Sequence, residues 1–265
     1  MTPRAQQALR TADLVCAEDT RVTGKLLSAF DIEKPLMRLD EEKMTTLADE
    51  VLDKVESGMR VAFCSDAGMP GVSDPGQRLI AAAYKRNLSV EVMPGPTACD
   101  TAYVKSGFLC PRFYFGGFFP RKTGEQQRLL ESLKALDSVL IFYESPRRVI
   151  SAVETIQKIM PYRTIAICRE LTKLHEELIE GSASEVLNLL HEHNEQGRLK
   201  GEIVLLIDAP NEKEKQNEQE NAELDAYDKA RALAEEGLSK KDIVRALKKE
   251  CGISRNAAYE IAMSV

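Results

Sequence analysis

The chain has 265 residues, a formal net charge of −6, 43% hydrophobic residues and 29% charged residues. This composition is typical of a folded globular protein and excludes a disordered or fibrous chain. No apolar run approaches the roughly 20 residues of a membrane helix, and the first residues lack the apolar stretch of a signal peptide. We therefore expect a cytoplasmic protein without membrane contact.

Helices and short apolar strands alternate in the first part of the chain. Thr2 and Pro3 predict a helix start, and residues 13–17 predict a short strand. Further helices are expected at 43–56 and 77–85 and in a stretch ending near Gly107, with strands at 61–64 and 89–93. Strands that alternate with helices predict a mainly parallel sheet covered by helices.

A second series begins after a break at residues 109–111. It contains predicted strands at 112–117, 138–143, 164–168, 174–180 and 202–207, and predicted helices at 124–136, 146–160 and 184–193. The strand at 174–180 is expected to pair as in a hairpin. We place a first α/β domain at residues 1–109 and a second at residues 110–210.

The remainder of the chain predicts a linker and a helical domain. Residues 211–221 contain no apolar side chain, so we interpret 211–222 as a solvated linker that cannot pack. Residues 223–265 predict three helices: the first at 224–236, the second begun by a capping box of Ser239 and Asp242, and the third following a turn at Gly252. The last two form a helix-turn-helix-like pair with basic residues Lys240, Lys241, Arg245, Lys248, Lys249 and Arg255. These predict a locally basic face, with an ordinary solvated helical cap as the alternative.

Metal binding and general attraction for nucleic acid are both disfavoured. The six cysteines are scattered without the close pairs of zinc or redox sites, and His191 and His193 point to different faces of a predicted helix. We therefore expect no metal. The acidic net charge means that nucleic-acid binding requires local basic patches.

The loop after the strand at 61–64 is the clearest sign of a ligand site. Between residues 65 and 76 it contains three glycines, two prolines and two aspartates. Glycines let a ligand approach the backbone closely, and prolines preset the shape of the loop. Asp66 and Asp74 disfavour a pyrophosphate and favour hydroxyls or a cation. S-adenosylmethionine has both, in its ribose diol and its ammonium and sulfonium groups.

Other strand ends carry polar residues as well. Residues 94–97 follow a predicted strand, so this loop opens on the same edge of the sheet, and Thr97 either caps the next helix or holds a polar part of the ligand. Residues 16–25, 143–148 and 169–177 combine carboxylates with basic side chains. A solvated ion-pair network explains any one of these segments. Together they suggest a cleft in which arginines hold phosphates and carboxylates orient a hydroxyl.

Five ordered segments carry a family resemblance: residues 17–21, 65–76, 94–97, 142–147 and 169–173. They resemble the small-subunit ribosomal RNA methyltransferases I, a bacterial family of the tetrapyrrole methylase superfamily. The resemblance implies two α/β domains with S-adenosylmethionine between them, a small C-terminal helix-turn-helix domain and a homodimer. It also implies 2′-O-methylation of a cytidine in the decoding centre of 16S rRNA, in the 30S subunit. Members of the family begin with a further strand and a Gly/Pro-rich turn, so we expect the first domain to lack its first strand.

The motif match also implies site residues. The cofactor contacts are expected from Asp66, Ala67, Gly68, Pro70, Ser73, Thr97, Ala98, Tyr143 and Glu144, with the strand entrance at Gly201 and Glu202 beside them. The candidate general bases are Glu18, Asp19 and Glu170, among which the sequence does not choose. The candidates for holding rRNA phosphates or orienting the acidic groups are Arg21, Arg147, Arg169 and Lys173, with an ordinary ion pair as the alternative for each.

Three other functions compete with this one. A methylase of a tetrapyrrole or another small molecule is disfavoured by the helical tail and the arginine clusters. A ligand-sensing DNA-binding regulator is disfavoured by the acidic net charge and by the need for two spaced half-sites. An interaction protein that is inactive because its first strand is absent is the third alternative.

Overall fold

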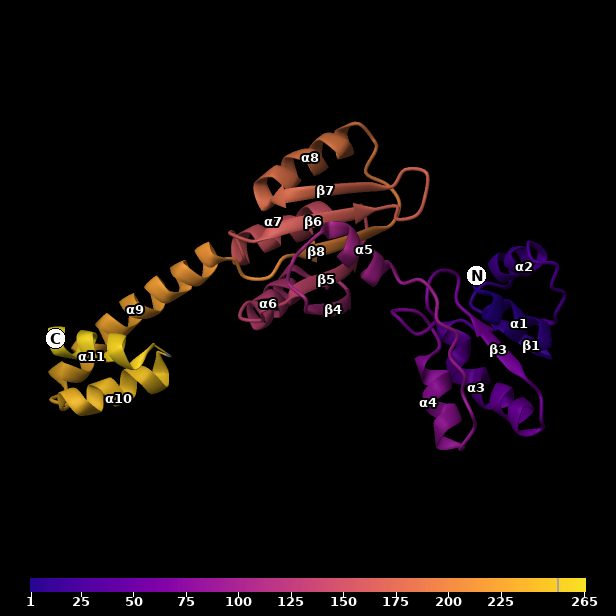
Figure 1. Cartoon of the computed structure of the whole chain (residues 1–265), viewed down its shortest axis with the longest axis horizontal. Helices are drawn as coiled ribbons and strands as arrows, with labels where there is room; N and C mark the ends of the chain where they lie inside the picture. The colour runs from indigo at the N-terminus through magenta and orange to yellow at the C-terminus, as the bar shows by residue number, and fades with distance from the viewer. Residues whose placement is uncertain (252) are drawn as a thin grey trace.

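The structure is a computed structural model that describes residues 1–251 and 253–265. Two α/β units and a C-terminal helical unit follow one another along the molecule (Figure 1). No helix in the described residues combines the length and the apolar character that a membrane span requires.

The first α/β unit is a small parallel sheet flanked by helices. Its strand order is β2-β1-β3, and β1 pairs in parallel with both neighbours, which confirms the predicted arrangement. The central strand β1 is fully buried, whereas β3 at the edge is half-buried along its whole length. The elements are α1 (Pro3–Thr11), β1 (Leu14–Ala17), α2 (Thr20–Ser28), β2 (Leu36–Arg38), α3 (Glu41–Glu56), β3 (Val61–Cys64) and α4 (Gln77–Lys85).

Two features of this unit differ from the prediction. Residues 89–93 form no strand, and Val92 is 52% exposed. The prediction of a strand there was wrong, because a strand needs a neighbour to complete its hydrogen-bond ladder and no described strand lies on the outer edge of β3. The structure adds the strand β2, whose three residues are too few for an alternation of apolar and polar side chains to reveal it.

The second α/β unit is a five-stranded mixed sheet. Its order is β4-β5-β8-β6-β7; β4 and β5 are parallel, and every other pair is antiparallel. The pairing of β6 with β7 confirms the predicted hairpin. The elements are α5 (Ala98–Ser106), β4 (Phe113–Phe118), α6 (Thr123–Leu133), β5 (Val139–Glu144), α7 (Val149–Ile159), β6 (Thr164–Arg169), β7 (Glu177–Ser182), α8 (Ala183–Glu195) and β8 (Ile203–Ile207).

This sheet is covered by helices on both faces. On one face Leu130 of α6, Ile156 of α7 and Leu190 of α8 are fully buried against the strands. On the other face α5 contributes Cys99 and Ala102 to a second buried cluster. Packing therefore groups α5 with the second unit, although α5 precedes the boundary predicted at residue 109.

The C-terminal unit consists of α9 (Glu212–Glu235), α10 (Lys240–Glu250) and α11 (Arg255–Ser264). Its own core includes Ala230, Leu247 and Ile261, each at most 2% exposed. The side chain of Ser239 caps α10 by accepting the N–H of Asp242, as predicted. The predicted turn at Gly252 lies outside the described residues.

The segment predicted as a linker that cannot pack is instead the first half of α9. Asn211 caps this helix by accepting the N–H of Glu214 at 2.9 Å. Glu214 is 2% exposed, and its Oε2 accepts a hydrogen bond from Nε of Arg163, itself 1% exposed, at 2.8 Å. The prediction was wrong because it considered only apolar side chains, whereas this contact joins two opposite charges.

Candidate functional site

The ends of β1 and β3 are joined by hydrogen bonds between the loops that follow them. The N–H of Glu18 donates to the carbonyl of Cys64 at 3.2 Å. The N–H of Asp19 donates to Oδ1 of Asp66 at 3.0 Å, and the N–H of Asp66 donates to Oε2 of Glu18 at 3.3 Å. We call these three hydrogen bonds the clasp of β1 and β3. They bring the predicted segments 17–21 and 65–76 together at the carboxyl edge of the first sheet.

An acidic cavity of about 390 Å³ opens beside the clasp. Its lining residues are Glu18, Glu41, Ser73, Asp74, Pro75, Gly76, Gln77 and Arg78. Burial raises the pKa of Asp74, and the neighbouring Glu18 and Asp66 raise it further, against the opposing effect of a hydrogen bond from Ser65. Arg78 is paired with Glu41 at 3.5 Å. The uncompensated negative charge around Asp74 favours a cationic ligand.

The aspartate loop approaches both the second predicted loop and the second α/β unit. Gly68 has φ of 73°, and a Cβ at this position would lie 3.4 Å from the carbonyl oxygen of Pro96. Gly117 at the end of β4 has φ of 68°, and a Cβ there would lie 3.3 Å from Oγ of Ser73. Glycine at both positions permits these close approaches, to the backbone of Pro96 and to the side chain of Ser73, so residues of both units border the site.

Tyr143 lies near the carboxyl end of β5 in the second sheet. Its ring contacts the rings of Phe115 and Phe118, with centroids 4.9 Å and 5.6 Å away. Burial raises the pKa of the Tyr143 phenol, and the negative charge of Asp74 contributes to the increase. Asp74, in the loop after β3, is therefore close enough to the end of β5 to affect the phenol of Tyr143 electrostatically.

Glu144 lies on the opposite face of the sheet from Tyr143, because side chains alternate along a strand. It is 4% exposed, its Oε1 accepts the N–H of Ser145 at 2.6 Å, and it pairs with Nη2 of Arg148 at 2.6 Å. Burial raises the pKa of Glu144, and Ser145 and Arg148 oppose that effect. Within the described chain, Oε2 of Glu144 and Nη1 of Arg148 are buried without a hydrogen-bond partner. Arg148 belongs to the charged segment 143–148 identified from the sequence, but it was not among the predicted site residues.

Asp19 and Glu170 have strong partners of their own. Asp19 caps α2 and pairs with Arg21 at 2.5 Å, so the Arg21 guanidinium holds the pKa of Asp19 well below its usual value. Oε1 of Glu170 accepts the N–H of Glu202 at 2.9 Å and is 3.0 Å from Nζ of Lys173. These contacts lower the pKa of Glu170, with the backbone hydrogen bond the larger cause.

Gly201, just before the start of β8, packs closely against the Glu170 side chain. Gly201 has φ of 92°, and a Cβ at this position would overlap the Glu170 carboxylate. Glu170 itself has φ of 49°, a conformation that non-glycine residues adopt rarely. The predicted residues Glu170, Gly201 and Glu202 are therefore packed together at the carboxyl end of β6.

The basic side chains that were predicted to hold phosphates differ in how far they are exposed to solvent. The side chains of Arg21 and Lys173 are 87% and 45% exposed. Arg147 is exposed, and the structure shows no ion pair for it among the described residues. The Arg169 side chain is only 12% exposed; its Nε lies 2.9 Å from Glu177, and it also donates to the carbonyl of Lys200 at 3.3 Å.

The second predicted loop has a structural role at Thr97. The Thr97 hydroxyl caps α5 by accepting the N–H of Asp100 at 3.2 Å, which was one of the two predicted alternatives. Ala67 and Ala98 are exposed, and Pro70 is half-buried. These three residues offer backbone groups and apolar contact rather than charge.

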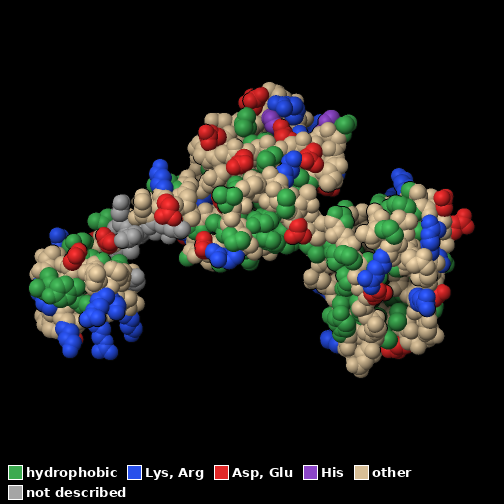
Figure 2. All heavy atoms as spheres, viewed as in Figure 1, with side chains coloured by type: hydrophobic (Ala, Val, Ile, Leu, Met, Phe, Trp, Pro, Cys, Tyr) green, Lys and Arg blue, Asp and Glu red, His purple; other side chains and the backbone are tan. Residues whose placement is uncertain are grey.

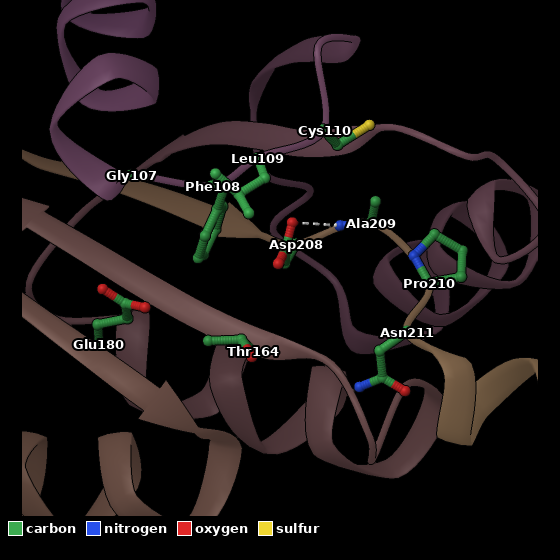
Figure 3. A pocket seen from close by; sticks show the side chains of 10 residues that line it. All are labelled: Gly107, Phe108, Leu109, Cys110, Thr164, Glu180, Asp208, Ala209, Pro210 and Asn211. Carbon is green, nitrogen blue, oxygen red and sulfur yellow. Dashed lines mark hydrogen bonds between the residues drawn. The ribbon is translucent and has the colours of Figure 1, made fainter.

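A second cavity, of about 330 Å³, lies at the other end of the second sheet (Figure 3). Thr164 at the start of β6 and Asp208 just after β8 lie on it, together with Glu180 of β7. Figure 3 shows these side chains below the loop that carries Phe108 and Leu109. Because β5 ends at the opposite edge of the sheet, this cavity is separate from the site at Tyr143.

Two α/β units, with glycine-rich loops and an acidic cavity at their strand ends, define an enzyme of the two-domain α/β methylase type. The chain belongs to the family Tetrapyrrole (Corrin/Porphyrin) Methylases, whose family model matches residues 1–187. It is therefore a methyltransferase, and the methyl donor of this family is S-adenosylmethionine.

Curated relatives are similar over most of the chain. A Synechocystis protein is 35% identical over 266 residues, which cover 100% of this chain and 93% of the relative. A Thermotoga maritima protein is 40% identical over 207 residues, covering 78% and 91%, and a Bacillus subtilis protein is 32% identical over 261 residues, covering 98% and 88%. All three relatives are called ribosomal RNA small subunit methyltransferase I.

Solved structures support the fold. The cobalamin biosynthetic enzyme cobalt precorrin-4 methyltransferase matches with a TM-score of 0.57 and 12% identity, covering 78% of this chain and 88% of that chain. The methyltransferase CobJ matches with a TM-score of 0.57 and 18% identity, covering 79% and 88%. At these identities the likeness confirms the expected fold and carries no information about substrate.

Proposed function

We propose that this methyltransferase methylates the ribose 2′-hydroxyl of a cytidine in the decoding centre of 16S rRNA, with the 30S subunit as its substrate. The relatives' shared name supports small-subunit rRNA as the substrate class. The observation that carries the proposal is the clasp of β1 and β3, which places Glu18 beside the acidic cavity. The place of action is the cytoplasm, where ribosomal subunits are found.

The residues of the acidic cavity fit the methyl donor. When bound, S-adenosylmethionine supplies a methyl group on a positively charged sulfur, already activated for displacement. Asp66 and Asp74 provide negative charge for such a ligand, and the closely spaced backbones at Gly68 and Pro96 provide a narrow cradle. We assign donor contacts to residues 66–73 and 97–98, and to Tyr143 from the second unit.

Glu18 is the general base that we favour among the three candidates. A base must be free to accept a proton, and the Asp19 and Glu170 carboxylates have lowered pKa values through strong contacts. In the part of the chain that the structure describes, the Glu18 carboxylate accepts one long hydrogen bond, from the N–H of Asp66, and it lines the cavity. Proximity and orientation provide most of the acceleration, and the base contributes about 10²-fold or more.

The exposed basic side chains at the strand ends are assigned to rRNA phosphates. Arg21, Arg147 and Lys173 reach solvent, whereas Arg169 is held by Glu177. We therefore propose that the first three contact phosphates and that Arg169 positions the loop that carries Glu170. Glu144 and Arg148, on the far face of β5, support the strand end that presents Tyr143.

The proposed homodimer is supported by an apolar surface on the second unit. Val104 of α5 and Leu109 in the following loop are 76% and 95% exposed, and Phe113 of β4 is 41% exposed. Large apolar side chains exposed to this degree are typical of surfaces that a partner covers. Sedimentation of the purified chain would show a dimer if a second copy is that partner.

The test is transfer of labelled methyl from S-adenosylmethionine to unmodified 30S subunits, followed by mapping of the modified nucleotide. Label on one cytidine ribose supports the proposal, whereas label on a small tetrapyrrole but not on 30S subunits contradicts it. Glu18→Gln should lose at least about 10²-fold in turnover while keeping its affinity for the donor. Glu170→Ala is the comparison: a loss of turnover there that exceeds the loss in Glu18→Gln would transfer the role of base to Glu170.

A further inference from the structure

One face of α10 carries a concentrated positive charge. Lys241, Arg245, Lys248 and Lys249 are exposed and follow the i, i+4, i+7, i+8 spacing that places side chains on one side of a helix. The buried residues of α10 point to the other side. Figure 2 shows the Lys and Arg side chains gathered on one surface of the C-terminal unit. We call these four residues the α10 basic face.

The acidic residues of the same helix do not neutralise this face. Oδ2 of Asp242 accepts a hydrogen bond from the Ser239 hydroxyl at 2.5 Å, at the start of the helix. Glu250 at the other end is paired with Lys229 of α9. Among the residues that the structure describes, none of the four basic side chains has an ion-pair partner, so their charge is available to an external anion.

The contact between α9 and the second unit holds this face away from the methyl-transfer site. Besides the buried pair of Arg163 with Glu214, the Asn211 amide donates to the carbonyl of Tyr162, and Nζ of Lys213 lies 5.1 Å from the Tyr162 ring centroid. Figure 1 shows α9 projecting from the end of the second unit that is opposite the first unit. A partner bound at the α10 basic face would therefore lie at a different place from the site at Tyr143.

We infer that the α10 basic face docks on the phosphate backbone of RNA, as a second contact for the large substrate. That the partner is RNA rests on the proposed function. That this face binds a polyanion rests on the positive charge of its four exposed side chains. A chain with net charge −6 repels a polyanion over most of its surface, so a concentrated basic face determines which part can approach. Four side chains on one helix face match a run of phosphates better than a single small anion.

The experiment compares two matched variants of the full chain. The test variant is Lys241→Gln, Arg245→Gln and Lys248→Gln. The control removes the same charges from exposed sites elsewhere, by Lys85→Gln, Arg128→Gln and Lys158→Gln. The affinity of each chain for 30S subunits and for 16S rRNA fragments is measured over a range of salt concentrations, with thermal unfolding and donor affinity as checks of folding.

The slope of log affinity against log salt is negative, and we expect it to become less steep by about 2 units in the test variant, since each lost phosphate contact removes about 0.7. Its KM for 30S subunits should rise while kcat at saturating substrate stays near that of the parent. Equal slopes for test and control variants would overturn the inference. So would an affinity for duplex DNA that depends on these residues while RNA affinity does not.

The outcomes for docking and for methyl transfer are separable. If the parent chain binds 30S subunits without methylating them, the proposed function fails, and the slopes still decide the role of the α10 basic face. If the parent methylates 30S subunits and the test variant binds them like the control, only the docking inference fails. A parent chain that binds neither RNA nor 30S subunits contradicts both.

Discussion

The buried pair of Arg163 and Glu214 should determine how firmly α9 is attached to the second unit. Glu214→Gln removes the negative charge and leaves the Arg163 guanidinium buried, with the carbonyls of Lys134 and Asp208 among its remaining partners. Removing one member of such a pair costs about 3–5 kcal/mol. Total stabilities are about 5–15 kcal/mol, so the effect is a large fraction of the whole.

A double variant separates charge from packing. In Arg163→Met with Glu214→Leu, neither charge is buried, but the carbonyls of Lys134 and Asp208 lose a donor. At roughly 1 kcal/mol for each lost hydrogen bond, the double variant should lose about 2 kcal/mol, which is less than Glu214→Gln alone. Gln216→Ala, at an exposed position of the same helix, is the control and should change little.

The assay is amide hydrogen exchange in the first turns of α9, together with urea unfolding followed by circular dichroism, since the chain has no tryptophan. Exchange reports local opening of the helix even when the rest of the unit stays folded. A cost below about 1 kcal/mol for Glu214→Gln in both measurements, or a double variant that is less stable than Glu214→Gln, would refute the reasoning from burial.

Three further predictions follow from the site and the surface. Gly201→Ala should destabilise by about 1–3 kcal/mol and lower turnover, because its Cβ overlaps Glu170; Gly197→Ala, with positive φ but open space, should cost about 1 kcal/mol in thermal unfolding. Donor affinity measured by calorimetry should rise with pH through the acid range above 3.8, because the pKa of Asp74 is raised and only its ionised form attracts a cation; Asp74→Asn should weaken this dependence. Leu109→Asp should shift sedimentation from dimer to monomer without changing the melting temperature by more than a few degrees.

Local sequence signals predicted most of the secondary structure. The helix at Pro3 begins at a threonine cap, β3 and α4 have the predicted bounds, and α5 ends before a glycine in the left-handed conformation. Each of these signals involves residues within a few positions of one another, so no tertiary contact is needed to read it. The strand predicted at 89–93 failed because its formation depends on a neighbouring strand.

Contacts between distant segments could not be predicted in the same way. The order β4-β5-β8-β6-β7 places the last strand of the unit at the centre of the sheet, and a run of apolar residues does not specify a neighbour. The Arg163–Glu214 pair joins residues 51 positions apart, and each residue alone resembles an ordinary surface charge. Sequence reasoning identified charge-rich strand ends, but only the packing shows which charges are enclosed.

This distinction divides the predicted site into two kinds of residue. Asp19, Glu170 and Arg169 are of the residue types expected in catalytic or phosphate-binding sites. Their side chains instead form ion pairs and hydrogen bonds within the protein, which hold the loops in place. Glu18 and Asp74 line the cavity, and among the described residues neither carboxylate has an ion-pair partner. A carboxylate that already has a cationic partner contributes little attraction for a cationic ligand. The acidic cavity of the first unit is therefore the place where donor binding and proton removal are best tested by substitution.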